Sequence, residues 1–296
     1  MSDIAHLDVA RARKLAEEAA ALKDAGDIDG AIAKYREAIR FNPTDAWLYN
    51  LALIHKYRGE WREAFDLNRR AYELDPEEEA TRWNLGIAAT ALRDWTTARE
   101  MWTRCGMKLA AGDGPVDDDF GSTPVRLNPD GDAEVVWARR LGPVRARITS
   151  VPLPESGFRY HDIVLHDGAA VGYRMSGEVE KPVFNVLELF EASTFGTWRL
   201  DVVAQSEQAL DAMAELCSGH GIELDDWTGM RYLCRQCSEG HPHDEHDHDG
   251  DEVWEEERSI GAAATSQAAI DALAGLTLPP GVALLSSECM IRPCDS

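Results

Sequence analysis

The stretch LCRQCSEGHPHDEHDHDGDE, residues 233–252, concentrates side chains that bind metal ions. It begins with two cysteines in C-x2-C spacing, which lets both thiolates converge on one tetrahedral zinc ion. Two further ligands are then needed, and they come either from a C-x4-C pair near the end of the chain or from the first two histidines of the stretch. The sequence therefore predicts a structural zinc site, with candidate ligands Cys234, Cys237, Cys289, Cys294, His241 and His243.

Two alternatives to zinc remain open for Cys234 and Cys237. A thiol redox pair requires C-x2-C at the start of a helix that follows a strand. The surrounding sequence MRYLCRQCSEG does not clearly have that form. Unligated thiols are the other alternative.

The histidines of this stretch indicate a second kind of metal chemistry. Residues 239–257 hold ten acidic residues, four histidines and no lysine or arginine. Imidazole nitrogens in a negative field attract divalent Zn, Ni or Cu ions loosely and exchangeably. Such a composition cannot bury a core, so we expect a disordered loop in the absence of a counter-ion. The loop is then either a metal-sensing or delivery segment, or a solvated acidic loop with incidental histidines.

The formal charge of the 296-residue chain, −23, is unevenly distributed. Residues 1–112 hold 17 Lys+Arg and 19 Asp+Glu, net −2, whereas residues 113–296 hold 13 and 34, net −21. This field repels phosphate backbones, so we expect no nucleic-acid partner. No apolar run is long enough to cross a membrane, and no export signal opens the chain. We therefore expect a cytoplasmic protein without a membrane partner, whose cysteines are thiols or metal ligands.

The elements that position these residues begin with a repeat in the first third of the chain. Small residues recur 33 and 34 positions apart at Ala31, Ala64 and Ala98, and Pro43 and Pro76 close the first two units. A period of this length predicts stacked helical hairpins. The aligned segments are AGDIDGAIAKYREAIRFNP (25–43), RGEWREAFDLNRRAYELDP (58–76) and LRDWTTAREMWTRCGMKLA (92–110).

This repeat resembles the tetratricopeptide repeat family over residues 5–112. Two positions depart from the family pattern: Asn68 stands where the second unit should carry an aromatic residue, and the third unit has no closing proline. The matching small-residue and proline positions are Ala31, Ala38, Pro43, Ala64, Ala71, Pro76, Gly86 and Ala98, and the matching aromatic positions are Tyr35 and Trp102.

The resemblance implies a right-handed superhelix whose concave wall is formed by the first helix of each hairpin. In many peptide-binding members, an asparagine at the places of Asn50 and Asn84 bonds the ligand's backbone or terminal carboxylate, because an amide offers both donor and acceptor. The alternative is that the wall aromatics only pack and the asparagines are only solvated. The implied peptide-binding residues are Tyr49, Asn50, Leu53, Lys56, Tyr57, Trp83, Asn84 and Ile87.

The rest of the chain predicts an α+β part. Residues 113–133 are rich in Gly, Pro and Asp and read as a linker. Residues 134–198 contain short β-branched or aromatic runs, which predict a strand-rich segment, with a hairpin turn at HDGAA (166–170). Whether these strands join the last sheet or form their own layer is left open by the sequence.

The last hundred residues contain a duplication. Residues 199–224 align with 259–284 at an offset of 60 without a gap, and nine of the 26 pairs are identical. In each half a serine, Ser206 or Ser266, stands at a helix start, and a glycine, Gly221 or Gly281, precedes a returning strand. Two strand-helix-strand halves predict a ferredoxin-like domain over 199–296.

These patterns predict a multidomain fold, α then α+β, and favour a non-enzymatic adaptor that binds a protein or peptide segment in the groove of the repeats and carries zinc in its C-terminal domain. The first alternative is a metal-handling protein that binds divalent ions with its histidine-rich loop. A metal-dependent enzyme is the second alternative, although the sequence contains no phosphate-binding glycine loop, nucleophile elbow or H-E-x-x-H helix.

Overall fold

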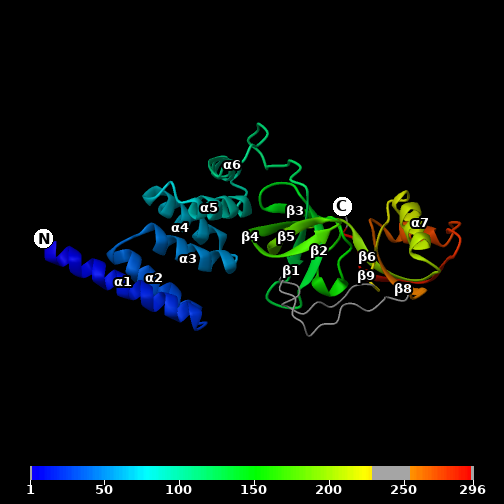
Figure 1. Ribbon diagram of the computed structural model, residues 1–296, viewed down its shortest axis with the longest axis horizontal. Helices are drawn as coiled ribbons and strands as arrows, with labels where there is room; N and C mark the ends of the chain where they lie inside the picture. Colours follow the sequence, from blue (N-terminus) through cyan, green and yellow to red (C-terminus); the bar gives the residue numbers. More distant parts are fainter. Residues whose placement is uncertain (1, 229–253, 295–296) are drawn as a thin grey trace. The chain divides into compact units, whose positions relative to one another are not determined.

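A computed structural model describes residues 2–228 and 254–294. The chain divides into two compact units, Met1–Asp118 and Asp119–Ser296. The first unit is helical and the second is built on two β-sheets (Figure 1).

The first unit consists of three consecutive helical hairpins. In each hairpin the two helices pack on each other, and successive hairpins pack through α2 on α3 and α4 on α5. The helices are α1 (Ser2–Asp24), α2 (Ile28–Phe41), α3 (Asp45–Tyr57), α4 (Trp61–Leu74), α5 (Glu79–Ala91) and α6 (Trp95–Arg104).

The turn inside each hairpin follows the repeat. Its left-handed residue is Gly26 (φ 84°), Gly59 (φ 68°) and Arg93 (φ 59°) in turn, again 33 and 34 positions apart. Glycine adopts this conformation without a steric penalty, whereas an arginine does so at a cost of about 1–2 kcal/mol. An aspartate caps the following helix in the outer two hairpins: Asp27 accepts from Gly30 N at 2.9 Å and Asp94 from Thr97 N at 3.1 Å.

The small residues of the repeat lie where helices approach closely. Ala31, Ala64 and Ala98 are almost completely buried. At Gly86 in α5, a Cβ atom would lie 2.7 Å from the indole ring of Trp102 in α6. The third hairpin therefore requires glycine at this position, which the repeat pattern had selected.

The first sheet of the second unit is a closed five-stranded barrel in the order β1-β2-β3-β4-β5. Neighbouring strands are antiparallel, and β1 closes the barrel by pairing in parallel with β5. Its interior is filled by alternate apolar side chains such as Val125, Val136 and Val164. The strands are β1 (Ser122–Leu127), β2 (Glu134–Arg140), β3 (Arg145–Ile148), β4 (Ile163–Ser176) and β5 (Val179–Glu191).

Two predictions for this region are wrong. The predicted linker, residues 113–133, contains β1, a buried strand whose Pro124 and neighbouring Gly and Asp residues obscured it. HDGAA is not a turn, because β4 continues through it with an irregular register between His166 and Ala170. The hairpin turn lies at Gly177, where φ is 60°. The barrel also answers the open question: strands 134–191 form their own layer.

The second sheet has four antiparallel strands in the order β7-β8-β6-β9. It starts at Gly196, three residues before the predicted domain boundary at 199. Helix α7 packs on β6 and β9, and α9 packs on β8, around a core that contains Trp198, Met213 and Ile260. The elements are β6 (Gly196–Ala204), α7 (Glu207–Ser218), β7 (Glu223–Asp226), β8 (Glu257–Ala264), α9 (Gln267–Leu273) and β9 (Val282–Ile291).

The paired residues of the duplication occupy equivalent places in this sheet. Ser206 caps α7 by accepting from Ala209 N at 3.2 Å, and Ser266 caps α9 by accepting from Ala269 N at 3.3 Å. Gly221 (φ 73°) and Gly281 (φ 81°) precede β7 and β9. The prediction of two serine caps and two turn glycines is confirmed.

None of the helices within 2–228 and 254–294 has the length and apolar character needed to span a membrane.

Candidate functional site

The predicted peptide-binding residues lie on two neighbouring helices of the first unit. Tyr49, Asn50, Leu53, Lys56 and Tyr57 belong to α3.

Trp83, Asn84 and Ile87 belong to α5, which contacts α3 directly. The amide of Asn84 approaches the hydroxyl of Tyr49, with 3.4 Å between Nδ2 and Oη. The structure therefore brings residues from both predicted helices together. We call the surface formed by these eight residues the α3–α5 wall.

The members of the α3–α5 wall differ in exposure. Tyr57 is 64% exposed, and Tyr49, Asn50, Leu53 and Trp83 are half-buried.

The other three members are buried: Asn84 is 7% exposed, Lys56 4% and Ile87 0%. Ile87 therefore offers no surface to a ligand in this structure, which differs from its predicted role. Repeat spacing places a residue on a face of its helix, but packing around that helix decides how much of the residue remains accessible.

Two adjacent polar atoms of the α3–α5 wall are buried without a hydrogen-bond partner among the described residues. These are the donor Nε1 of Trp83 and the acceptor Oδ1 of Asn84. The Asn84 amide nitrogen, by contrast, donates to Ala80 O at 2.9 Å within its own helix. A buried polar group without a partner costs about 1–3 kcal/mol. The wall therefore carries a donor and an acceptor that a ligand's peptide group would satisfy.

A charged network fixes the end of α3. His55, which is buried, donates through Nδ1 to Glu60, and Arg58 reaches Glu60 at 2.9 Å and Asp29 of the preceding hairpin at 2.7 Å. The hydrogen bond from His55 and the guanidinium of Arg58 hold the pKa of the Glu60 carboxyl below its usual value. This network orients the turn after Lys56 and Tyr57 and was not predicted, since its members lie up to 31 residues apart in the sequence.

A surface hollow of about 510 Å³ lies beside α6 and was also not predicted. Arg99 donates to the carbonyls of Ala110 and Gly114, so the chain after α6 folds back around this guanidinium. Its lining includes Thr103, Arg104 and Leu109. The sequence gives no signal for it, because it depends on the path of a loop.

Comparison with known proteins identifies the helical unit. The sequence profile of the family described as TPR repeat matches residues 19–56, which cover the end of α1, all of α2 and most of α3. The N-terminal unit is a tetratricopeptide-repeat array. No curated protein matches the chain.

Similar solved structures also carry tetratricopeptide repeats. Yeast Tom70 is 18% identical, with a TM-score of 0.31, and the likeness covers 32% of this chain and 20% of Tom70. The Sgt2 TPR domain from Aspergillus fumigatus is 24% identical (TM-score 0.30; 32% of this chain, 63% of that one). The second TPR of Spaghetti (RPAP3), bound to the HSP90 peptide SRMEEVD, is 19% identical (TM-score 0.32; 34% and 89%).

The predicted metal ligands fall into two groups. Cys234, Cys237, His241 and His243 lie outside the described residues, as do positions 239–253 of the predicted disordered loop.

Cys289 and Cys294 are described, and both are exposed free thiols. Cys289 lies in β9 opposite Trp198, whereas Cys294 accepts a hydrogen bond from Arg159 at 2.8 Å. A guanidinium at this distance would repel a zinc ion, so Cys294 does not fit as a metal ligand. Within 2–228 and 254–294, no cluster of three or more His, Cys, Asp or Glu residues is placed to hold a metal.

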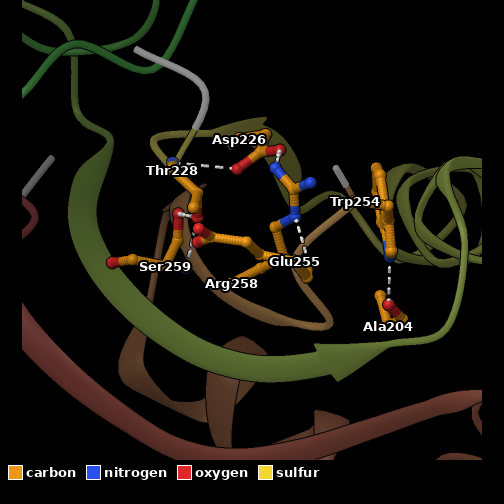
Figure 2. Close-up of polar contacts among 7 residues, drawn as sticks. All are labelled: Ala204, Asp226, Thr228, Trp254, Glu255, Arg258 and Ser259. Carbon is orange, nitrogen blue, oxygen red and sulfur yellow. Dashed lines mark hydrogen bonds and ion pairs between the residues drawn. The ribbon is translucent and has the colours of Figure 1, made fainter. Parts of the chain in front are cut away.

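The described residues on either side of segment 229–253 are fastened to the four-stranded sheet (Figure 2). Before the segment, Thr228 accepts from Ser259 N at 2.7 Å. After it, the Trp254 indole donates to Ala204 O at 2.7 Å, and the Arg258 guanidinium lies 3.8 Å from the Trp254 ring centroid.

Arg258 joins the two sides of the segment. It donates to Asp226 in β7 at 2.8 Å and to Glu255 O at 2.9 Å (Figure 2). The predicted disordered loop therefore ends too late in the sequence: residues 254–257 make defined contacts, since Trp254 and Arg258 give that end an aromatic and a cationic anchor.

Proposed function

We propose that this protein is a non-enzymatic adaptor that binds a peptide or protein segment on the α3–α5 wall. The observation that carries the proposal is the pair of unpartnered polar atoms, Trp83 Nε1 and Asn84 Oδ1. A peptide backbone offers one N–H and one C=O per residue, so an extended segment can satisfy both at once.

The side chains around this pair support a peptide ligand. Tyr49, Leu53 and Tyr57 offer apolar surface on α3, and Asn50 adds a second amide on the same helix. Large aromatic residues beside a few polar groups are typical of surfaces that bind a chain rather than a small ion. Cytoplasmic location remains a prediction.

We also propose that the four-stranded sheet is a ferredoxin-like duplication. The order of elements, β-α-β-β-α-β, and the equivalent serine caps and turn glycines support it.

For the metal, we propose a structural zinc on Cys234 and Cys237, completed by His241 and His243. The fastened residues Thr228 and Trp254 support this choice only by holding the two ends of segment 229–253 on one sheet. Metal content by mass spectrometry, repeated after deletion of 241–249, separates the alternatives. Several loosely bound ions lost with the deletion would favour metal handling, and unaltered content would leave the two histidines without a role.

Selection from a phage-displayed library of random peptides tests the adaptor function. Selected peptides are then titrated against the whole protein by fluorescence anisotropy. We expect Asn84→Ala to weaken binding by about tenfold, the effect of losing roughly one hydrogen bond to the ligand. The matched control is Glu73→Ala on the exposed side of α4, which should bind like the parent.

Equal affinity of the Asn84→Ala variant and the parent would place the binding surface elsewhere. Circular dichroism of both variants shows whether the helical unit remains intact.

A further inference from the structure

Val151, in the segment after β3, links the barrel to the four-stranded sheet through both of its backbone groups. Its N–H donates to the carboxylate of Asp225 in β7, and its C=O accepts from the indole N–H of Trp227 at 2.9 Å. Trp227 lies against β8 at Gly261, where a Cβ atom would be 2.2 Å from the indole. Two side chains of one sheet therefore hold one residue of the other.

A second carboxylate holds the same segment from the barrel side. Leu153 N lies 3.1 and 3.2 Å from the two carboxylate oxygens of Glu134 in β2. We call the five residues Glu134, Val151, Leu153, Asp225 and Trp227 the joint.

Both carboxyl groups of the joint are largely buried. Burial raises the pKa of Glu134 to about 7 and that of Asp225 to about 6, although the amide hydrogen bonds act in the opposite direction. Neither carboxylate forms an ion pair with a described residue, whereas Asp226 next to Asp225 is neutralised by Arg258 at 2.8 Å.

The charges around the joint are mostly negative. Glu155 raises the pKa of Glu134 further, and Glu223 does the same for Asp225. The titratable and charged groups near the joint are Glu155 after the barrel strands, Glu223 and Asp226 of β7, Arg258 of β8, and Arg147, Tyr160 and His161 of the barrel side.

We propose that the joint is a proton-controlled coupling between the barrel and the four-stranded sheet, closed when Glu134 and Asp225 are protonated and loosened when both are ionised. A neutral carboxyl still accepts the amide hydrogen bond through its carbonyl oxygen. An ionised pair instead buries two negative charges beside further acids with no cation to balance them. Because β7 leads directly into segment 229–253, the protonation state also determines how firmly the start of that segment is held.

The sign follows from the difference between the folded and unfolded states. Each carboxyl has a higher pKa when folded than its usual 4.5 or 3.8, so the folded joint binds protons more tightly than the open chain. Closure is therefore strongest below about pH 4, and it is lost as the pH rises through 6 to 7. One pKa unit corresponds to a factor of ten.

Hydrogen exchange of the full-length protein tests the proposal at the amides of Val151 and Leu153. Rates are measured between pH 5.5 and 8 and divided by the intrinsic rate at each pH, which leaves the opening equilibrium. We expect opening at these amides to rise about tenfold or more over this range, while the amide of Val125 in β1 changes much less.

The double substitution Glu134→Gln and Asp225→Asn should hold the joint closed at every pH, because amides accept like neutral carboxyls. The matched control is Asp211→Asn on the exposed side of α7, which should keep the parent's pH dependence. Exchange at Val151 and Leu153 that does not depend on pH in the parent, or that keeps its pH dependence in the double variant, would overturn the proposal.

If the double variant does not fold, carbon-13 NMR of the parent decides the question. Titration of Glu134 and Asp225 near 7 and 6 supports the coupling, and titration of both near 4 refutes it.

Discussion

Replacing Gly86 with alanine tests the packing of the third repeat. The new Cβ would lie 2.7 Å from Cη2 of Trp102 and 2.8 Å from Cζ2 and Cζ3, all on the six-membered ring of the indole. This ring cannot easily move, because Trp102 is 1% exposed and packs edge-on against Trp83 with 5.1 Å between centroids.

Two effects of opposite sign decide the magnitude. Alanine is favoured over glycine inside a helix by about 1 kcal/mol. Overpacking a filled core costs about 1–3 kcal/mol, and a contact this short belongs at the upper end of that range. We therefore expect Gly86→Ala to lower the free energy of unfolding of the helical unit by about 1–2 kcal/mol.

Urea unfolding, followed by circular dichroism at 222 nm, measures the change. Gly30→Ala is the matched control, because its Cβ would meet only the side chain of Asp27, which can rotate away at the cost of a cap worth about 1 kcal/mol. A double-mutant cycle with Trp102→Leu should show that most of the penalty disappears with the ring. Stabilisation by Gly86→Ala, or a penalty independent of Trp102, would refute this account of the α5–α6 contact.

Further predictions concern the second unit. Ser206→Ala and Ser266→Ala should each cost about 1 kcal/mol in urea unfolding, since each removes one helix cap, and a large difference between them would argue against equivalent halves. His166 is fully buried, and burial lowers its pKa to about 4. Since the unfolded chain takes up the proton near 6.5, His166 should destabilise the barrel by about 1–3 kcal/mol as the pH falls from 6.5 to 4. His166→Gln should remove that loss in unfolding experiments at pH 7.5 and 4.5, and an unchanged pH dependence would contradict it. Gly261→Ala should displace Trp227 and speed hydrogen exchange at Val151, whereas unchanged exchange would show that the indole is not needed there.

The helical unit was predictable because its signals are local and repeated. Ala31, Ala64 and Ala98 report a close helix approach within one repeat length, and the self-alignment at offset 60 located Ser206 and Ser266 in the same way. Both patterns reflect elements whose geometry is set by residues near in sequence.

The remaining features depend on contacts between distant residues. Strand β1 contains Pro124 and becomes a strand only because β2 and β5 pair with it. The joint brings together Val151 and Asp225, which are 74 residues apart. The burial of Ile87 likewise depends on packing that spacing alone does not encode.

The indole N–H of Trp83 gives the most direct test of peptide binding on the α3–α5 wall. Its nitrogen-15 resonance, assigned with a Trp83→Phe variant, is followed while a selected peptide is added to the whole protein. Since this N–H has no partner among the described residues, binding at the wall should shift its proton resonance downfield as it gains an acceptor. Saturation by the peptide with the Trp83 resonance unchanged would contradict the proposed function.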